Sequence, residues 1–331
     1  MLFKEDEAAR AEARAVRENA AWYRWTHDLV EVKGPDAGRL VQHLFVSDMD
    51  KVPVGRSKYT TMLNEDGKII DDVIVMHMGD DLYWVSTLYG PQFVAWASEH
   101  DEGFDVTCKD ITKDIDMYAV QGPNSLAVMN DLAAEPVDDL KRFAIMNDSI
   151  AGVDVKIHRA GFTGELGYEI YVPMEQSSAI EAALTETGEK TGVPELQILE
   201  VYVRSIPVEK GFALRQDMYG LTPYECDLGW SVAMDTDFVG KEALQAAVEA
   251  GNDYKLVGLE FLNDSYEDIA QREIVYRRGV PCGFVRAAIY GYTVDKNIGF
   301  AVIEAAKAIN GEEVTVGENE SPAIICDKVF V

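Results

Sequence analysis

The sequence predicts an α+β protein with more than one domain, of which the last is built mainly from strands. The chain has 331 residues, and a length of roughly 150 residues per domain suggests two or three domains. Before Ala250, strand and helix patterns alternate without the evenly spaced rhythm of a doubly wound parallel sheet. Beyond Ala250, short alternating strands separated by Gly and Pro indicate a separate all-β domain.

The first third of the chain carries clear helix and strand signals. The charged, alanine-rich stretch Met1–Tyr23 predicts a helix, and Leu29–Lys33 predicts a strand. The turn residues Gly34–Pro35–Asp36 then precede an amphipathic helix over Ala37–Phe45. Further on we expect strands at Leu82–Thr87, Phe104–Cys108 and Met117–Gln121, and a helix at Gln92–Glu99.

Two strand–turn–strand units stand out by their glycines. The first spans Tyr59–Val75, with Asn64–Gly67 as its turn, and the second spans Val155–Val172, interrupted by Gly161–Gly164. The remaining expected elements are helices at Ser177–Gly192 and Glu195–Val208, and C-terminal strands at Val257–Phe261, Glu313–Val316 and Ile324–Val329.

The charge of the chain is strongly negative. It has 30 basic and 58 acidic residues, a formal net charge of -28. Such a protein repels phosphate backbones and anionic lipid at long range, so we expect neither nucleic acid nor a membrane as a partner. An anionic ligand would need a local cluster of Arg and Lys.

Cofactor signatures and targeting signals are absent from the sequence. The four cysteines have no paired spacing and the five histidines are scattered, so we expect neither a metal site nor disulfides. No Gly-x-Gly-x-x-Gly fingerprint for a flavin or nicotinamide occurs. Without a signal peptide or a run of about 18 apolar residues, the expected location is the cytoplasm.

Several motifs, in order along nearly the whole chain, together resemble one enzyme family. They are Gly34–Pro35–Asp36–Ala37, Leu63–Asn64–Glu65–Asp66–Gly67–Lys68–Ile69–Ile70–Asp71–Asp72, Gln121–Gly122–Pro123, Gly161–Phe162–Thr163–Gly164–Glu165–Leu166–Gly167–Tyr168–Glu169, Glu209–Lys210–Gly211–Phe212, Leu228–Gly229–Trp230 and Asn297–Ile298–Gly299–Phe300–Ala301. This series is similar to the aminomethyltransferase family, which includes the glycine cleavage T-protein and tetrahydrofolate-dependent demethylases.

The resemblance implies a three-domain cloverleaf around a central channel that holds a folate. In this arrangement, a discontinuous folate-binding α+β domain would comprise residues 1–50 and 115–235. An inserted α/β domain with the aspartate-bearing hairpin would comprise residues 51–114, and the C-terminal β-barrel residues 250–331. The cofactor implied is tetrahydrofolate, as the acceptor of a one-carbon unit.

Two carboxylates match the family's most important site residues. A pterin ring presents two parallel N–H donors that a single carboxylate can accept, and Glu169 matches the pterin-binding glutamate. Asp72 matches the carboxylate beside the reactive pterin nitrogen, where it would stabilise charge developing during transfer. Asp71 and Asp72 point to opposite faces of a strand, so we expect only one of them, Asp72, to enter the site.

The resemblance also implies further ligand contacts. Tyr59, Tyr168 and Phe162 correspond to aromatic positions around the pocket, with Phe162 where the T-protein has a tyrosine. Ser86 stands where the T-protein has an asparagine that contacts the folate. Arg204 lies near the family's arginine, in a helix where Pro207 replaces another usual arginine.

Three functions are compatible with this resemblance. The favoured one is transfer of a methyl group from an O-, S- or N-methyl donor to tetrahydrofolate, because Phe162, Ser86 and Glu209–Lys210–Gly211–Phe212 depart from the T-protein pattern. The alternative is aminomethyl transfer from a lipoyl carrier protein in glycine cleavage. A folate-binding scaffold without turnover is less favoured, since the Lys–Gly–Cys–Tyr signature of those relatives is missing.

Overall fold

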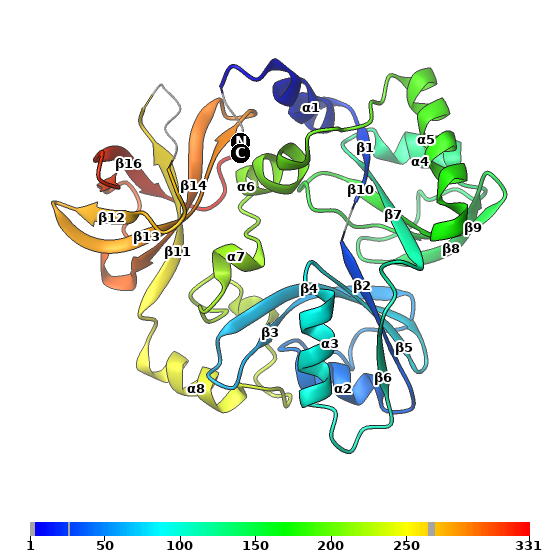
Figure 1. Cartoon of the computed structure of the whole chain (residues 1–331), viewed down its shortest axis with the longest axis horizontal. Coiled ribbons are helices and arrows are strands. Elements are labelled where there is room, and N and C mark those ends of the chain that lie inside the picture. Colours follow the sequence, from blue (N-terminus) through cyan, green and yellow to red (C-terminus); the bar gives the residue numbers. More distant parts are fainter. Residues whose placement is uncertain (1–3, 26, 264–268) are drawn as a thin grey trace.

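The computed structural model describes residues 4–25, 27–263 and 269–331. These residues form three lobes around a central region (Figure 1), where the short helices α6 (Ile206–Glu209) and α7 (Arg215–Met218) lie. Within them, two lobes are built on five-stranded sheets and the third is a closed barrel. The predicted α+β cloverleaf with a C-terminal barrel is therefore confirmed.

The first lobe is an antiparallel sheet with one helical face. α4 (Ser125–Leu132) and α5 (Ser177–Thr191) pack against that face over a core that includes Tyr118, Tyr168 and Leu184. The opposite face belongs to a second apolar cluster with α1 (Glu7–Glu18). In spatial order the strands are β1 (Ala21–Arg24), β7 (Ile115–Gln121), β10 (Gly167–Pro173), β9 (Val153–His158) and β8 (Ile145–Ile150).

The second lobe is also an antiparallel sheet, and it takes in more of the chain than expected. The domain boundary at residues 50 and 51 needs correction, because β2 (Asp28–Lys33) pairs with both neighbours inside this sheet. α2 (Ala37–Leu44) packs Leu40 and Leu44 into the same core. The other elements are β3 (Arg56–Leu63), β4 (Ile69–Gly79), β5 (Leu82–Thr87), β6 (Thr107–Asp110) and α3 (Gly90–Glu99).

The third lobe is the all-β domain expected at the C-terminal end. Its sheet closes because the last strand pairs with the first, Gly258 lying opposite Cys326. α8 (Lys241–Ala250) leads into the barrel, and the strand predicted at Glu313–Val316 has those bounds. The barrel strands are β11 (Tyr254–Phe261), β12 (Ile274–Arg277), β13 (Val280–Gly291), β14 (Lys296–Glu304), β15 (Glu313–Val316) and β16 (Ser321–Cys326).

Two helix predictions need correction at their bounds. In the stretch Glu195–Val208 the helix begins only at Leu199, because the Leu196 amide donates to the Trp22 carbonyl, and it continues through a π-helical turn, η2 (Val201–Ser205), into α6. In the region Met1–Tyr23, whose first three residues lie outside the description, the helix is confined to α1 and Tyr23 lies in β1. Single 3-10 turns occur at η1 (Met174–Gln176), η3 (Gly229–Ser231) and η4 (Ala305–Lys307).

A contact between two glycines fixes the tip of the β3–β4 hairpin. Gly67 and Gly240 have positive φ values of 74° and 81°. A Cβ atom on Gly240 would lie 2.2 Å from the Asn64 carbonyl oxygen, and one on Gly67 would lie 2.6 Å from the Leu244 nitrogen. Only glycine permits this backbone approach, which docks the hairpin on the start of α8.

A buried arginine joins the first lobe to the barrel. Arg17 of α1 donates to the Thr163 carbonyl (2.6 Å) and the Glu165 carboxylate (2.9 Å) in the glycine-rich turn of the first lobe. Its other amino group donates to Glu209 of α6 (3.0 Å), which also accepts from the Thr293 amide of the barrel (2.7 Å). Arg17 thereby connects α1, the glycine-rich turn and the barrel.

We expect Arg17→Met to lower the free energy of unfolding by about 3–5 kcal/mol, because it leaves the fully buried Glu209 carboxylate without its charge partner. Arg14→Met on the same helix is the matched control, since Arg14 is 66% exposed and pairs with Glu18, which is 70% exposed. That change should cost less than about 0.5 kcal/mol. Urea unfolding of both variants tests this, and equal losses would contradict it.

Candidate functional site

A cavity of about 900 Å³ lies where the three lobes meet. Both sheets contribute side chains to its wall, as do the segment after α6 and the last residues of the chain. The wall mixes aromatic rings with charged groups of both signs. The charged residues are Asp71, Asp72, Arg142, Glu169, Lys210, Arg215, Asp227, Asp327 and Lys328.

Glu169 faces the cavity from β10 and is held by two donors. Its Oε2 accepts a hydrogen bond from the Tyr171 hydroxyl (3.0 Å) and lies 2.8 Å from His158 Nδ1. No described residue occupies its other oxygen, Oε1, and the side chain is 15% exposed. Burial acts to raise the pKa of this carboxyl, but hydrogen bonding and charge from His158, with His27 and Tyr171, hold the pKa below its ordinary value.

Tyr168, the neighbour of Glu169, does not reach the cavity. Strand alternation turns it to the other face of β10, where it is 1% exposed in the core beneath α4 and α5. The expectation that Tyr168 contacts a ligand is therefore wrong for this structure. The residue that shares the face of Glu169 is Tyr171, two positions further on.

Asp72 and Tyr59 form a second polar group in the wall. They lie on one face of the β3–β4 ladder, and the Tyr59 hydroxyl donates to Asp72 Oδ2 over 3.2 Å. Burial, followed by repulsion from Asp71, raises the pKa of Asp72 to about 8. The ring of Tyr59 stacks on Trp230, which is 67% exposed at the edge of the cavity.

Asp71 lies on the opposite face of β4, as expected, yet it also contributes to the cavity wall. Its Oδ2 accepts from the Thr87 hydroxyl over 2.6 Å, and burial raises its pKa to about 6. The expectation that only one of the pair can reach the site needs correction. Beside Asp71 the ladder shifts register, between Met62 and Leu63, so strict alternation ends there.

Ser86 and Phe162 both line the cavity, where we expected them. Ser86 sits on β5 opposite Ile74, on the sheet face that carries Tyr59 and Asp72. Phe162, in the glycine-rich turn, packs between Trp25 and Phe212 with ring-centre distances of 6.2 and 5.8 Å. This part of the wall is therefore apolar.

Arg204 does not line the cavity, which corrects the expectation that it contacts the ligand. Both of its amino groups donate to the buried Asp217, over 2.8 and 3.1 Å. The arginine that does line the cavity is Arg215 of α7, whose guanidinium lies 3.8 Å from the ring centre of Tyr89. Its Nε donates to the Ile70 carbonyl, next to the two aspartates.

Sequence analysis did not identify Arg215, because it lies outside the family motifs. The excess of acidic residues did indicate that any anionic ligand would need a local set of cations. Arg142, Lys210 and Lys328 complete that set in the wall. Lys210 pairs with Glu165 at 3.2 Å, and Lys328 with Asp227 at 3.2 Å. The cavity wall therefore carries local positive charge, although the net charge of the whole chain is -28.

His27 is a further cavity residue that no motif indicated. Among the described residues, neither ring nitrogen has a hydrogen-bond partner, although both are buried. Burial lowers its pKa, against the opposing effect of the Glu169 charge. A buried imidazole without partners beside Glu169 leaves a donor and an acceptor available to a ligand.

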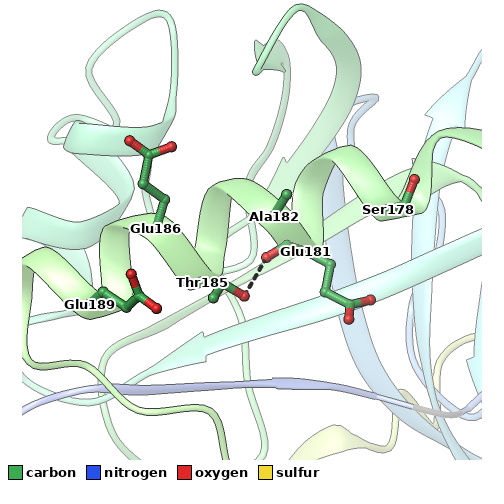
Figure 2. A pocket seen from close by; sticks show the side chains of 6 residues that line it. All are labelled: Ser178, Glu181, Ala182, Thr185, Glu186 and Glu189. Carbon is green, nitrogen blue, oxygen red and sulfur yellow. Dashed lines mark hydrogen bonds between the residues drawn. The ribbon is translucent and has the colours of Figure 1, made fainter.

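A second, shallow depression differs in character from the cavity. It runs along the exposed side of α5 and is lined by Ser178, Glu181, Ala182, Thr185, Glu186 and Glu189 (Figure 2). The glutamates extend outward from the helix, and the Thr185 hydroxyl only caps the carbonyl of its own turn. This depression is the solvated face of a helix.

The described part of the chain has neither a cluster of metal-ligating side chains nor a membrane-spanning helix. In the described part of the chain, no three His, Cys, Asp or Glu side chains are grouped so that they could hold a metal ion. None of the helices in residues 4–25, 27–263 and 269–331 is long and apolar enough to cross a membrane.

Models of two known protein domains match nearly the whole chain. Residues 3–236 match the model of the GCVT N-terminal domain, and residues 255–331 match that of the glycine cleavage T-protein C-terminal barrel domain. The aminomethyltransferase of Anoxybacillus flavithermus is 34% identical over 326 residues, 93% of this chain and 85% of that protein. A probable aminomethyltransferase of Haloarcula marismortui is 30% identical over 326 residues, covering 94% and 87%.

A solved structure has the same fold. The glycine cleavage system aminomethyltransferase T from Bartonella henselae superposes with a TM-score of 0.87 over 98% of this chain and 89% of that one, at 22% identity. Both domain models, the curated relatives and the three-lobed fold agree. The chain therefore belongs to the aminomethyltransferase family of glycine cleavage T-protein type, a family of one-carbon transferases.

Proposed function

We propose that this protein transfers an aminomethyl-derived one-carbon unit from a lipoyl carrier protein to tetrahydrofolate bound in the central cavity. One observation carries the proposal: a single cavity presents an ionised Glu169 with a free oxygen and, from another lobe, Asp72 with a pKa of about 8. Relatives that are named aminomethyltransferases and are 30–34% identical support this chemistry over methyl transfer.

The residues in the wall fit a reduced folate. Glu169 Oε2 is already occupied by two donors, while Oε1 is open to the paired N–H groups of a pterin edge. His27 lies beside it with unused ring nitrogens. The cavity volume of about 900 Å³ suits a ligand of this size. Arg142, Lys210, Arg215 and Lys328 would meet the carboxylates of the folate's glutamate tail.

Asp72 is the group we assign to the transfer step. Tetrahydrofolate, when bound, supplies the nitrogen that accepts the one-carbon unit. With a pKa near 8, Asp72 exchanges a proton readily near neutral pH, and in its ionised form it stabilises positive charge on a neighbouring nitrogen. The Tyr59 hydroxyl orients the carboxylate, and burial keeps its charge from being screened by water.

A second candidate is transfer of a methyl group from an O-, S- or N-methylated small molecule to tetrahydrofolate. The apolar wall formed by Trp25, Phe162 and Phe212 favours it, because a methylated donor would bury its methyl group there. Incubating the protein and tetrahydrofolate with an aminomethyl-loaded lipoyl protein, and separately with a panel of methylated compounds, distinguishes the two. The folate product, methylene- or methyl-substituted, identifies the reaction.

We expect Glu169→Gln to weaken tetrahydrofolate binding by about 1–3 kcal/mol, because an amide cannot accept two parallel donors. Isothermal titration calorimetry measures the change. Glu175→Gln, an exposed change of equal charge six residues further on, should bind like the wild type. If both variants bind equally well, Glu169 does not hold the ligand.

We expect Asp72→Asn to lower the single-turnover rate about 10²-fold while the folate dissociation constant changes little, because its carboxylate acts on charge that develops during transfer. In the wild type the rate should rise as the pH passes about 8, where Asp72 loses its proton.

The matched variant is Asp71→Asn. It removes the repulsion that raises the pKa of Asp72, so the rise in rate should move to lower pH with the maximum rate retained. Rate–pH profiles of the three proteins test this, and a profile of Asp72→Asn equal to the wild type would exclude Asp72 from the chemistry.

A further inference from the structure

A buried chain of polar side chains links Glu169 to the second lobe. His158 of β9 lies opposite Glu169 in the β9–β10 ladder, with its Nδ1 2.8 Å from Glu169 Oε2. Its Nε2 lies 2.7 Å from the hydroxyl of Ser57, which belongs to β3. His158 is 0% and Ser57 6% exposed, and of the three only Glu169 lines the cavity. Ser57 is thus not available as a nucleophile.

The hydrogen-bond partners determine which ring nitrogen carries the proton. An ionised carboxylate only accepts, so Nδ1 of His158 must donate to Glu169. In neutral His158, the Nε2 lone pair then accepts from the Ser57 hydroxyl. In the cation, Nε2 donates to Ser57, whose own proton turns to the Phe143 carbonyl 3.5 Å away. Both ring nitrogens of His158 and the Ser57 hydroxyl therefore have a partner in both states.

Phe143 lies between the cavity and the hydrogen-bonded side chains of His158 and Ser57. Its φ of 62° is unusual for a bulky residue and costs on the order of 1–3 kcal/mol. The conformation is held by its amide, which donates to the Arg159 carbonyl (2.8 Å), and by its carbonyl, which accepts from the Ser57 amide (2.9 Å). Its ring lines the cavity 6.5 Å from the imidazole of His158.

We propose that His158 is a positioning residue that keeps Glu169 ionised and oriented, and so sets the lower pH limit at which the cavity binds reduced folate. The inference rests on the proposed function for the identity of the ligand. Around Glu169, the other titratable groups are Tyr171 on the same strand, Tyr23 of β1 and His27 before β2. Tyr171 also reaches the second lobe, through Ser86 of β5, whereas His158 does so through Ser57 of β3.

The direction of the pH effect follows from burial. Burial alone acts to raise the pKa of Glu169, and the largest opposing effect is the His158 hydrogen bond. Without that donor, the carboxyl takes up a proton as the pH falls and can no longer accept both pterin donors. Affinity should then be lost at low pH and recovered at high pH, whereas a merely structural role would weaken binding at every pH.

Two substitutions separate the functions of the ring nitrogens. His158→Gln can retain the contact with Ser57 but loses the donor to Glu169, while His158→Asn retains a donor near Nδ1. Calorimetry with tetrahydrofolate should show His158→Gln close to the wild type near pH 8 and about tenfold weaker near pH 6, a change equivalent to one pKa unit. His158→Asn should lose less. An equal loss at both pH values in His158→Gln would overturn the proposal.

Nitrogen-15 NMR of the histidines in the wild-type protein gives a test that needs neither a variant nor a ligand. We expect neutral His158 to carry its proton on Nδ1, and a spectrum with the proton on Nε2 alone would overturn the proposal. If the proton is on Nδ1 but tetrahydrofolate binds at no pH, the proposed function fails while the assignment of His158 as the residue that positions Glu169 is supported.

Discussion

The ion pair between Arg17 and Glu209 is the interaction on which the placement of the barrel against the first lobe depends. Each lobe closes an apolar core of its own, so hydrophobic burial within the lobes does not by itself determine their relative orientation. Arg17 makes directional bonds to the glycine-rich turn and to α6, and Glu209 extends them to the barrel. The second lobe packs against both through apolar clusters shared between the lobes, and the central cavity lies where all of them meet.

The cavity shifts the pKa values of two carboxyls in opposite directions. Two donors on Oε2 of Glu169, His158 and Tyr171, favour its charged form, whereas burial and the like charge of Asp71 favour the neutral form of Asp72. A carboxyl with a lowered pKa and one with a raised pKa in a single wall allow one to bind and the other to exchange a proton. The two come from different lobes, so this division depends on the assembly of the lobes.

Local patterns predicted much of the fold and part of the site. The glycine turns, hairpin and alternating strands placed β2, β4, β5, α2 and β15 close to their observed bounds, because turn chemistry and periodicity act within a few residues. The family resemblance indicated Asp72, Tyr59 and Ser86, with strand phase favouring Asp72 over Asp71, and the structure has the three on one face of the sheet. The same alternation shows why Tyr168 could not join Glu169 in the cavity, a conflict visible in the sequence alone.

Composition and motif order determined the α+β class, the C-terminal barrel, the family and the two carboxylates at the centre of the site. Only the tertiary structure decided that Arg215 rather than Arg204 faces the cavity, since Arg204 is bound by Asp217, and that Ser57 supports His158 from another lobe. It also decided that Asp71 reaches the wall and that β2 belongs to the second sheet. These outcomes depend on which groups from distant parts of the chain meet and compete for hydrogen-bond partners. The periodicity of a single segment cannot predict the result of that competition.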